Sequence, residues 1–501
     1  MVEVRSKASK ARVPLGMITD VGSTDPHCQW AKIGTLPDEV LLEIFDFYFD
    51  DFEIEAREDE EIDAWFTLVH VCRQWRYVVI VSPRRLNLRL LCTRYRPVRE
   101  MLEVWPVLPI AVWESFPETS QEDGVENIFA VLEHSDRIHE INFQRIPSSL
   151  LERYIAMMQV PFPVLTSLEL MSSDDEWPTV RAAIPDSFLG GSAQRLRLLD
   201  LNGIPFPALR TLLLTATDLV KLSLWRIPHS AYVSPGALAT CLSSLVRLTS
   251  LTLGFLSPRS RPDIVTRRPP LVRTILPALV YLDFKGTSAY LEDLVARVDT
   301  PCLNETRITF FNQLIFDTPR IHQFLGRAEQ FEPPNQANVI FDTRDVVVSL
   351  SPPMTIVDEE DAGVLFRISC TDLDWQLASM TQVCTPSLPP LSTLEHLYIR
   401  VTTSQQERLQ IDIENDQWPE FLHPFSAVKN LYLSEGIMLS VAHALQELSG
   451  ESVTEVLPAL QNIFLEGLQP SGPVQEAIGT FIAARQLSGH PVVVHDWERE
   501  W

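Results

Sequence analysis

The residues of this 501-residue chain that could carry chemistry are scattered rather than grouped. His134 and His139 lie five positions apart, which is the wrong spacing for one helix face, and His443 lies in a run of helical spacing where packing or solvation is its ordinary role. No Gly-x-Gly-x-x-Gly or Gly-x-x-x-x-Gly-Lys loop is present for phosphate, no His-Glu-x-x-His for zinc and no Gly-x-Ser-x-Gly nucleophile turn. We therefore expect no catalytic, cofactor-binding or metal-binding residues, and we expect the chain not to be an enzyme.

The cysteines argue against both a disulfide framework and a zinc site. No Cys-x-x-Cys pair occurs, the number of cysteines is odd and they are dispersed, which is typical of thiols in a reducing compartment. Arg73 and Arg76 follow Cys72, but the helical spacing puts Cys72 on an apolar helix face, so we expect it to pack rather than to react. The seven are Cys28, Cys72, Cys92, Cys241, Cys302, Cys370 and Cys384.

Two helices near the N-terminus are the first elements that the sequence predicts. Pro37 suits a first helical position, and the acids Asp38 and Glu39 complement the unpaired amides of the first turn. Apolar side chains then follow one helix face, at Val40, Leu41, Ile44, Phe45 and Tyr48. A second run has the same three- and four-residue steps, at Trp65, Leu68, Val69, Cys72, Trp75 and Val79. Two short helices cannot bury both of their faces alone, so a partner is implied.

At these residues the sequence resembles an F-box, the motif that docks a protein onto the Skp-type adaptor of a cullin-RING ubiquitin ligase. The matching elements are the Leu36-Pro37 opening, the apolar helix face and the Val71-Cys72-Arg73-x-Trp75-Arg76 ending. The apolar-Ser-Pro continuation at 78–83 is similar to that of fungal F-box proteins. The resemblance implies that residues 31–90 bind the adaptor. The implied contact residues are Leu36, Pro37, Val40, Leu41, Ile44, Phe45, Leu68, Val69, Cys72 and Trp75.

An acidic insert at 50–63 departs from a compact F-box, which has only a short connection between these two parts. Nine carboxylates share the insert with a single basic residue, Arg57, so mutual repulsion favours a solvated surface loop or a loose helical extension. A calcium-binding loop would need a central glycine, and none is present. The insert either lengthens the loop harmlessly or weakens adaptor docking.

Beyond residue 127 an apolar-x-x-apolar-x-apolar pattern recurs ten times. It begins at Ile138, Leu165, Leu196, Leu209, Leu219, Leu248, Leu279, Leu394, Val428 and Leu460. The last two apolar positions lie two residues apart and so face one side of a short strand. Segments 234–245, 288–298 and 437–448 between these strands have helical spacing. Leucine-rich repeats have this signature, in which stacked parallel strands bury their inward leucines against one another.

The pattern lapses between Leu282 and Leu394. The gap contains three strand-like runs, at 338–341, 346–350 and 365–370, with breakers at Pro352-Pro353 and in the acidic run 358–361. Residues 285–393 therefore form either degenerate repeats with a protruding hairpin or a separate small β unit.

Composition narrows the class of partner. The net charge of −25 disfavours nucleic acids and anionic membranes, which both require a positive face. No run approaches the ~18–20 apolar residues of a membrane span, and the N-terminus lacks the apolar core of a secretory signal. We expect an intracellular protein, cytoplasmic or nuclear, whose partners are proteins.

The sequence thus predicts an α/β chain with an N-terminal all-α F-box-like unit and an irregular leucine-rich-repeat solenoid built on a parallel sheet. The expected domains are a flexible tail at 1–30, the helical unit at 31–115 and the repeats at 116–501. The resemblance implies an F-box adaptor that recruits an unidentified substrate protein to a Skp-cullin-RING ubiquitin ligase through its repeats. The alternatives are a leucine-rich-repeat scaffold no longer part of a ligase and, from another class, an enzyme with an unrecognised site in 285–393.

Overall fold

The computed structural model describes residues 36–55, 64–82, 86 and 88–497, apart from 97, 105–107, 116–123, 174–182, 259–272, 329, 332, 353–362, 385–390, 392, 403–416, 449, 451 and 469–470. The expected tail at 1–30 and residues 56–63 of the acidic insert lie outside this range. The chain divides into two compact units, Met1–Leu88 and Arg89–Trp501. The expected boundary at residue 115 is therefore wrong, because residues 90–115 contribute the first two strands of the sheet in the second unit.

The described part of the first unit contains helices α1 (Asp38–Glu55), α3 (Ala64–Val71) and α4 (Arg73–Val81). Pro37 lies just before α1 rather than in its first turn, and its carbonyl accepts from the N–H groups of Val40 and Leu41. α1 continues to Glu55, so the first six residues of the acidic insert, 50–55, are helical.

The second helical run is two helices rather than one. Cys72 interrupts it in an extended conformation (φ −158°, ψ 174°), and its Sγ accepts a hydrogen bond from the N–H of Trp75. Cys72 is exposed, so the expectation that it packs on an apolar helix face is wrong. The core of this unit includes a T-shaped contact of Phe45 with Trp75, whose ring centroids are 4.9 Å apart, together with the buried Leu41 and Val69.

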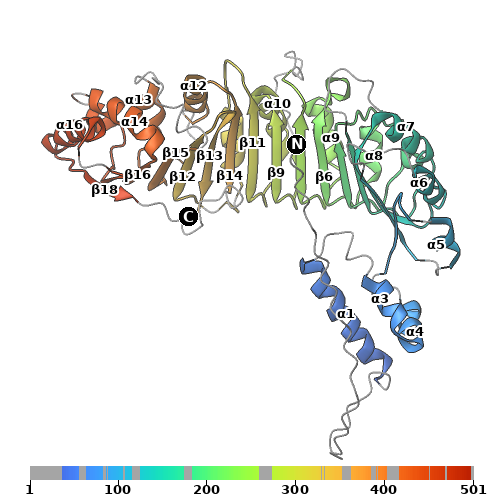
Figure 1. The fold of residues 1–501 in the computed structure, drawn as a ribbon. Coiled ribbons are helices and arrows are strands. Elements are labelled where there is room, and N and C mark those ends of the chain that lie inside the picture. The colour runs from blue at the N-terminus through green and yellow to red at the C-terminus, as the bar shows by residue number, and fades with distance from the viewer. Residues whose placement is uncertain are drawn as a thin grey trace, which may run out of the picture. The chain divides into compact units, whose positions relative to one another are not determined.

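Within the described residues of the second unit, one sheet has 16 strands, in the order β1-β2-β3-β4-β5-β6-β7-β9-β11-β14-β13-β12-β15-β16-β17-β18 (Figure 1). β8 (Thr274–Ile275) and β10 (Val298–Asp299) form a separate two-stranded pair. The strands of the large sheet are β1 (Leu90–Cys92), β2 (Ile110–Ser115), β3 (Ile138–Ile146), β4 (Ser167–Ser172), β5 (Leu198–Asn202), β6 (Lys221–Ile227), β7 (Ser250–Phe255), β9 (Tyr281–Gly286), β11 (Glu305–Phe311), β12 (Gln336–Phe341), β13 (Asp345–Ser351), β14 (Val364–Ser369), β15 (His396–Val401), β16 (Asn430–Leu433), β17 (Asn462–Glu466) and β18 (Val493–Trp497).

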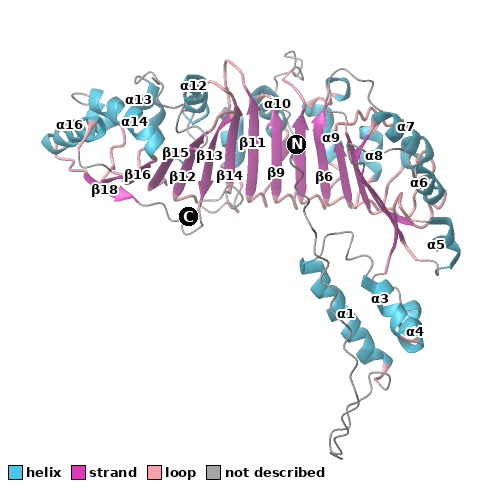
Figure 2. Cartoon of the chain, in the orientation of Figure 1, coloured by secondary structure: helices cyan, strands magenta, loops and turns pink. Residues whose placement is uncertain are grey.

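Helices cover one face of this sheet (Figure 2). Strands such as β4 and β9 alternate buried and partly exposed side chains, as expected when only one face meets the helices. No helix within the described residues is long and apolar enough to cross a bilayer. The helices of this unit are α5 (Val98–Val104), α6 (Val125–Leu132), α7 (Ser148–Met157), α8 (Leu209–Thr215), α9 (Pro235–Leu242), α10 (Ser288–Val295), α11 (Pro319–Leu325), α12 (Leu373–Cys384), α13 (Gln417–Leu422), α14 (Glu435–Glu447), α15 (Ser452–Glu455) and α16 (Pro473–Leu487).

The leucine pattern predicts the strands correctly at nine of its ten positions, since nine of the ten apolar-x-x-apolar-x-apolar segments contain a strand. Leu199, Leu222 and Leu251 are paired in register on β5, β6 and β7, and all three are buried. The exception begins at Leu209, where the chain forms α8. Leu209, Leu212 and Leu213 have the i, i+3, i+4 spacing of a helix face, and all three are buried on it.

The sheet continues through 285–393, so neither a protruding hairpin nor a separate β unit is correct. β12 and β13 form an antiparallel hairpin within the sheet, and β13 also pairs antiparallel with β14. β14 continues the parallel sheet next to β11, and β12 continues it next to β15. The sheet is therefore mostly parallel, with β13 as the reversed strand. The run of valines in β13 is typical of a strand that is buried on both faces. The strand therefore lacks the leucine pattern of the one-sided strands.

A turn at the strand ends repeats along the chain. The second residue after the last inward side chain adopts a left-handed conformation, at Arg145 (φ 54°), Gly203 (φ 74°), Arg226 (φ 53°) and Gly467 (φ 66°). An isoleucine or leucine follows each, and a proline comes directly after the isoleucines. At both arginines the strand register shifts. The turn thus recurs at the ends of β3, β5, β6 and β17.

The first prediction tests the register. Leu222 is fully buried, so Leu222→Ala should lower the free energy of unfolding by about 2–5 kcal/mol. Ser223 lies on the opposite face of the sheet, but it is only 6% exposed and its hydroxyl donates to Asp200 Oδ1 at 2.9 Å. Ser223→Ala should therefore cost about 1–2 kcal/mol. Urea denaturation measures both, with Ser250→Ala on the neighbouring strand as the control. A smaller loss for Leu222→Ala than for Ser223→Ala would contradict the assigned register.

The second prediction tests the left-handed turn. Gly203→Ala should cost about 1–2 kcal/mol, because a Cβ is strained at this φ. Arg145→Gly, at the equivalent position of β3, should leave stability unchanged or raise it by up to about 1 kcal/mol. Thermal and urea unfolding decide the matter, and a loss of similar size in both variants would show that φ is not the cause.

Candidate functional site

The face of the sheet that the helices do not cover, here called the outer face, carries the polar side chains of the repeats. Strand pairing aligns its middle row across the sheet. From β3 to β9 that row is Asn142, Glu169, Asp200, Ser223, Thr252 and Asp283. Because the core leucines lie on the other face of the strands, the residues of this row are separate from the core.

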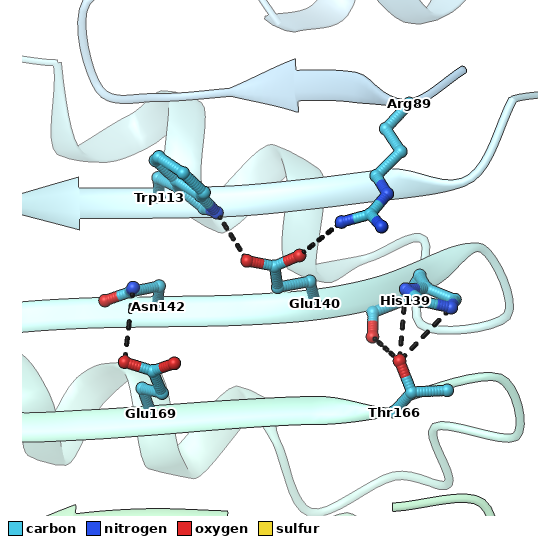
Figure 3. Close-up of polar contacts among 7 residues, drawn as sticks. All are labelled: Arg89, Trp113, His139, Glu140, Asn142, Thr166 and Glu169. Carbon is cyan, nitrogen blue, oxygen red and sulfur yellow. Dashed lines mark hydrogen bonds and ion pairs between the residues drawn. The ribbon is translucent and has the colours of Figure 1, made fainter. Parts of the chain in front are cut away.

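At the first strands the polar groups are matched to one another (Figure 3). Glu140 accepts from the guanidinium of Arg89 at 2.8 Å and from the indole N–H of Trp113 at 3.0 Å. His139 lies against the hydroxyl of Thr166, 3.1 Å away, and burial lowers the pKa of its imidazole. The Glu140 carboxylate is held by one donor on the neighbouring strand β2 and one just before β1, so this cluster orders the outer face and is not arranged for proton transfer.

Toward the centre of the sheet the row is acidic and partly desolvated. Burial raises the pKa of Asp200, although the Ser223 hydroxyl and Lys221 oppose the shift. Burial also raises the pKa of Asp283 to about 6, although Arg307 and neighbouring cations favour the charged form. Desolvation thus outweighs nearby positive charge at both carboxyls.

At the C-terminal strands aromatic side chains replace the acids. Tyr398, Tyr432, Phe464 and His495 occupy the same row on β15, β16, β17 and β18, and we call them the aromatic ladder. Successive ring centroids lie 4.2, 4.4 and 4.8 Å apart, with interplanar angles of 13°, 10° and 21°. The guanidinium of Arg400 lies 5.1 Å from the ring of Tyr398. A ladder of this kind is a rigid surface suited to contact with another chain.

A polar row runs beside the ladder. His396, Asn430 and Asn462 pair in register on β15, β16 and β17. Asn462 Nδ2 donates to Asn430 Oδ1 at 2.8 Å, and the amide of Asn430 lies 3.4 Å from His396 Nδ1. His495 Nε2 lies 3.1 Å from Asn462 Oδ1, which joins this row to the ladder. The two rows together make one connected surface.

The residues expected to contact an adaptor separate into three groups by exposure. Leu41, Phe45, Leu68 and Val69 are buried inside the first unit, Leu36 and Trp75 are half-buried, and Pro37, Val40, Ile44 and Cys72 are exposed. The helix face expected to hold Val40 with Leu41 is therefore split between core and surface. Phe47, which the expectation omitted, is exposed and lies one turn beyond Ile44.

The aromatic ladder was also missed from the sequence. Tyr398, Tyr432 and Phe464 each occupy the x position between the two inward apolar residues of the pattern, and this recurrence was the available signal. Within the described residues no group of three or more histidine, cysteine, aspartate or glutamate side chains is placed to hold a metal.

Comparison with known proteins adds little. No family model matches the chain, and no curated protein matches it. Among solved structures it is similar to the leucine-rich repeat-containing protein LegL7 from Legionella pneumophila, with 14% identity and a TM-score of 0.23 over 81% of this chain and 99% of that one. The fold assignment rests on the strand pairing and burial described above.

The third prediction uses Asp283. The pKa of this carboxyl is about 6 in the folded chain, above its unfolded value of about 3.9, so its favourable contribution is present below pH 4 and is lost as the pH rises through 6. Asp283→Asn should raise the free energy of unfolding by about 1–2 kcal/mol more at pH 8 than at pH 4.5. Urea denaturation at the two pH values measures this difference. Asp218→Asn, in an exposed pair with Arg247, is the control and should change little at either pH. Equal effects of Asp283→Asn at both pH values would contradict the prediction.

Proposed function

We propose that this chain is a protein-binding adaptor of the F-box type. Its first unit would dock on a Skp-type adaptor, and the outer face of its sheet would hold a substrate protein for ubiquitination by a cullin-RING ligase. The protein would supply proximity rather than bond chemistry, because holding substrate lysines near a charged conjugating enzyme raises their effective concentration.

One observation carries this proposal. Val40, Ile44 and Phe47 are 42%, 42% and 73% exposed, and their i, i+4, i+7 spacing makes them a single apolar stripe on α1, here called the α1 stripe. The helix already has its own core contacts through Leu41 and Phe45 on another side. A second apolar stripe on one surface helix is a feature of helices that pack against a partner protein.

Further exposed apolar side chains support docking through the same unit. Val71 at the end of α3 is 54% exposed, and Tyr77 and Val81 on α4 are 62% and 60% exposed. The resemblance to an F-box at Leu36-Pro37 and at the Cys72 turn suggests that the partner is a Skp-type adaptor. The six cysteines within the described residues are free thiols, which fits a protein that acts inside the cell.

The second candidate is a repeat scaffold that no longer enters a ligase. The continuation of α1 to Glu55 supports this second candidate, because α1 is helical at positions where a compact F-box has only a short connection. In that case the outer face would still bind proteins, and the α1 stripe would serve some other contact.

The fourth prediction separates the two. Val40→Glu together with Ile44→Glu should weaken binding of a purified Skp-type adaptor at least about tenfold, because charge replaces apolar contact at the stripe. Both side chains are exposed, so the fold should survive, and circular dichroism checks that it does. Pull-down and titration calorimetry with the full chain measure the affinity.

Two further variants complete this experiment. Leu487→Glu makes the same kind of change at an exposed position of α16 and should leave adaptor binding unaltered. Leu36→Ala with Pro37→Ala should cost about 1–3 kcal/mol of binding through loss of one apolar anchor and of the helix start. Wild-type affinity in the stripe variant would exclude the proposed docking, and no binding by the wild-type chain would favour the scaffold.

A further inference from the structure

We propose that β18, the last strand of the sheet, pairs antiparallel with β18 of a second copy of this chain. The pairing joins the two sheets into one, with a two-fold axis that passes between the two His495 residues. This inference goes beyond the proposed function and does not depend on adaptor docking by the first unit.

The two edges of the sheet differ in exposure. At the first edge every residue of β1 is buried. At the last edge Val493 is 54% exposed, and each other residue of β18 is half-buried or exposed. Within the described residues β17 is the strand that pairs with β18, and the other side of β18 is an open edge. An open strand edge can pair with a further strand, and the ends of solenoids are normally capped.

The hydrogen bonds to β17 show which backbone groups face the open edge. The N–H of Val493 donates to the carbonyl of Gln461 at 2.9 Å. Alternate residues of a strand direct their backbone groups to opposite sides, so Val493 and the residues two and four positions later bond to β17. The N–H and C=O groups of Val494 and Asp496 therefore point away from β17. An extended backbone is the partner that satisfies such a row of groups.

The second β18 fits this edge in one register. In an antiparallel ladder, residues that lie opposite each other exchange both of their hydrogen bonds at alternate positions. When Val494 of each chain lies opposite Asp496 of the other, every outward N–H and C=O group of both strands has a partner. The two His495 residues then lie directly opposite each other. A shift by two residues would pair only Val494, or only Asp496, within the two strands.

The aromatic ladder selects the same register. Phe464 lies against one face of the His495 ring, with a centroid distance of 4.8 Å and an interplanar angle of 21°. Among the described residues Phe464 is the aromatic side chain that contacts His495, so the other face of the imidazole lies toward the open edge. Opposed side chains in an antiparallel pair have Cβ atoms about 4.5–5.5 Å apart. The two imidazoles are therefore within stacking distance, and the two ladders meet end to end.

The remaining side chains of β18 allow this approach. Trp497 leans back over its own sheet, with its ring 5.4 Å from that of Tyr432 on β16. Asp496 is exposed and accepts from the N–H of Leu468 at 3.0 Å, so its carboxylate keeps its charge and stays in water beside Val494 of the other chain. A pair of five-residue strands is smaller than a standard protein interface. We therefore expect a reversible dimer with a dissociation constant of about 1–100 µM.

An extended segment of another protein is the rival occupant, because any such backbone could satisfy the open edge. Self-complementarity favours the second copy, since the backbone groups and the terminal ring of the ladder both match their own symmetry mates in one register. The two-fold axis is perpendicular to the sheet, so both outer faces lie on the same side of the dimer. The dimer thus presents two identical outer faces to a multivalent partner.

Sedimentation velocity of the full chain at about 1–200 µM tests the proposal. We expect a reversible equilibrium between monomer and dimer. Val494→Pro removes an N–H that points away from β17, so the fold should persist while the dissociation constant rises at least about tenfold. Thermal unfolding of the variant verifies the fold.

Disulfide trapping tests the register and does not depend on the proline variant. His495→Cys should give a disulfide-linked dimer under mild oxidation, because the two opposed Cβ atoms lie within reach of a disulfide. Val493→Cys is the matched control on the same face of β18. It should not be trapped, since the pairing separates the two Val493 positions by about 13 Å along the strands. The wild-type chain, which has seven cysteines of its own, is the blank, and mass spectrometry identifies the linked peptides.

Three results would each overturn the proposal. They are a chain that stays monomeric over the whole concentration range, an unchanged dissociation constant in a folded Val494→Pro variant, and equal trapping of Val493→Cys and His495→Cys. A monomer would leave the open edge to a segment of another protein. Adaptor binding by the first unit is measured separately, so failure of the dimer leaves the proposed docking standing, and failure of the docking leaves the dimer standing.

Discussion

The second unit depends on a single constraint, which is that neighbouring strands pair in a register that places leucine beside leucine. Leu168, Leu199 and Leu222 are partners on β4, β5 and β6, and each is fully buried. A single repeat of this size could not bury its apolar face alone, so its leucines are covered by the neighbouring repeats. A shift of one residue would move those leucines onto the outer face and expose them to water. The hydrophobic burial of each strand is therefore contingent on its neighbours.

The same register organises the surface. Since inward and outward side chains alternate, aligning the leucines also aligns the residues between them into rows that cross many strands. In the first half of the sheet the middle row holds Glu169, Asp200 and Asp283. In the last four strands it holds the aromatic ladder. One backbone plan thus carries two chemically different surfaces, and the antiparallel β13 and its buried neighbours lie between them.

The strands were predictable at nine of the ten segments that have the leucine pattern, as at Leu196 and Leu248. The pattern failed at Leu209, where the same letters also satisfy helix spacing and the local context forms α8. β13 could not be placed, because its valines are buried on both faces and strand order is a long-range property. The left-handed turn was visible in the recurrence of arginine or glycine before isoleucine and proline, but its backbone conformation was not.

Surfaces were harder to predict than strands. Helical spacing grouped Val40, Leu41, Ile44 and Phe45 on one face, yet the short unit has room in its core for only part of that face. Which part of that face is buried depends on how α1 packs against α3 and α4. The spacing of residues within one helix does not predict this packing. The ladder, similarly, exists only because distant strands pair in register. In both cases the sequence shows the residue types, but it does not show which of those residues lie on a common surface.

We propose that α1 offers its exposed stripe to one partner, while the outer face of the sheet is a separate surface for another protein. Hydroxyl-radical footprinting of the full chain, alone and with a purified Skp-type adaptor, tests this most directly, because it reports side-chain exposure residue by residue. We expect Phe47 and the peptides that contain Val40 and Ile44 to lose reactivity on adding the adaptor. Leu487 and the aromatic ladder should react as before. Unchanged reactivity of Phe47, or protection of the ladder by the adaptor, would contradict this division of the molecule.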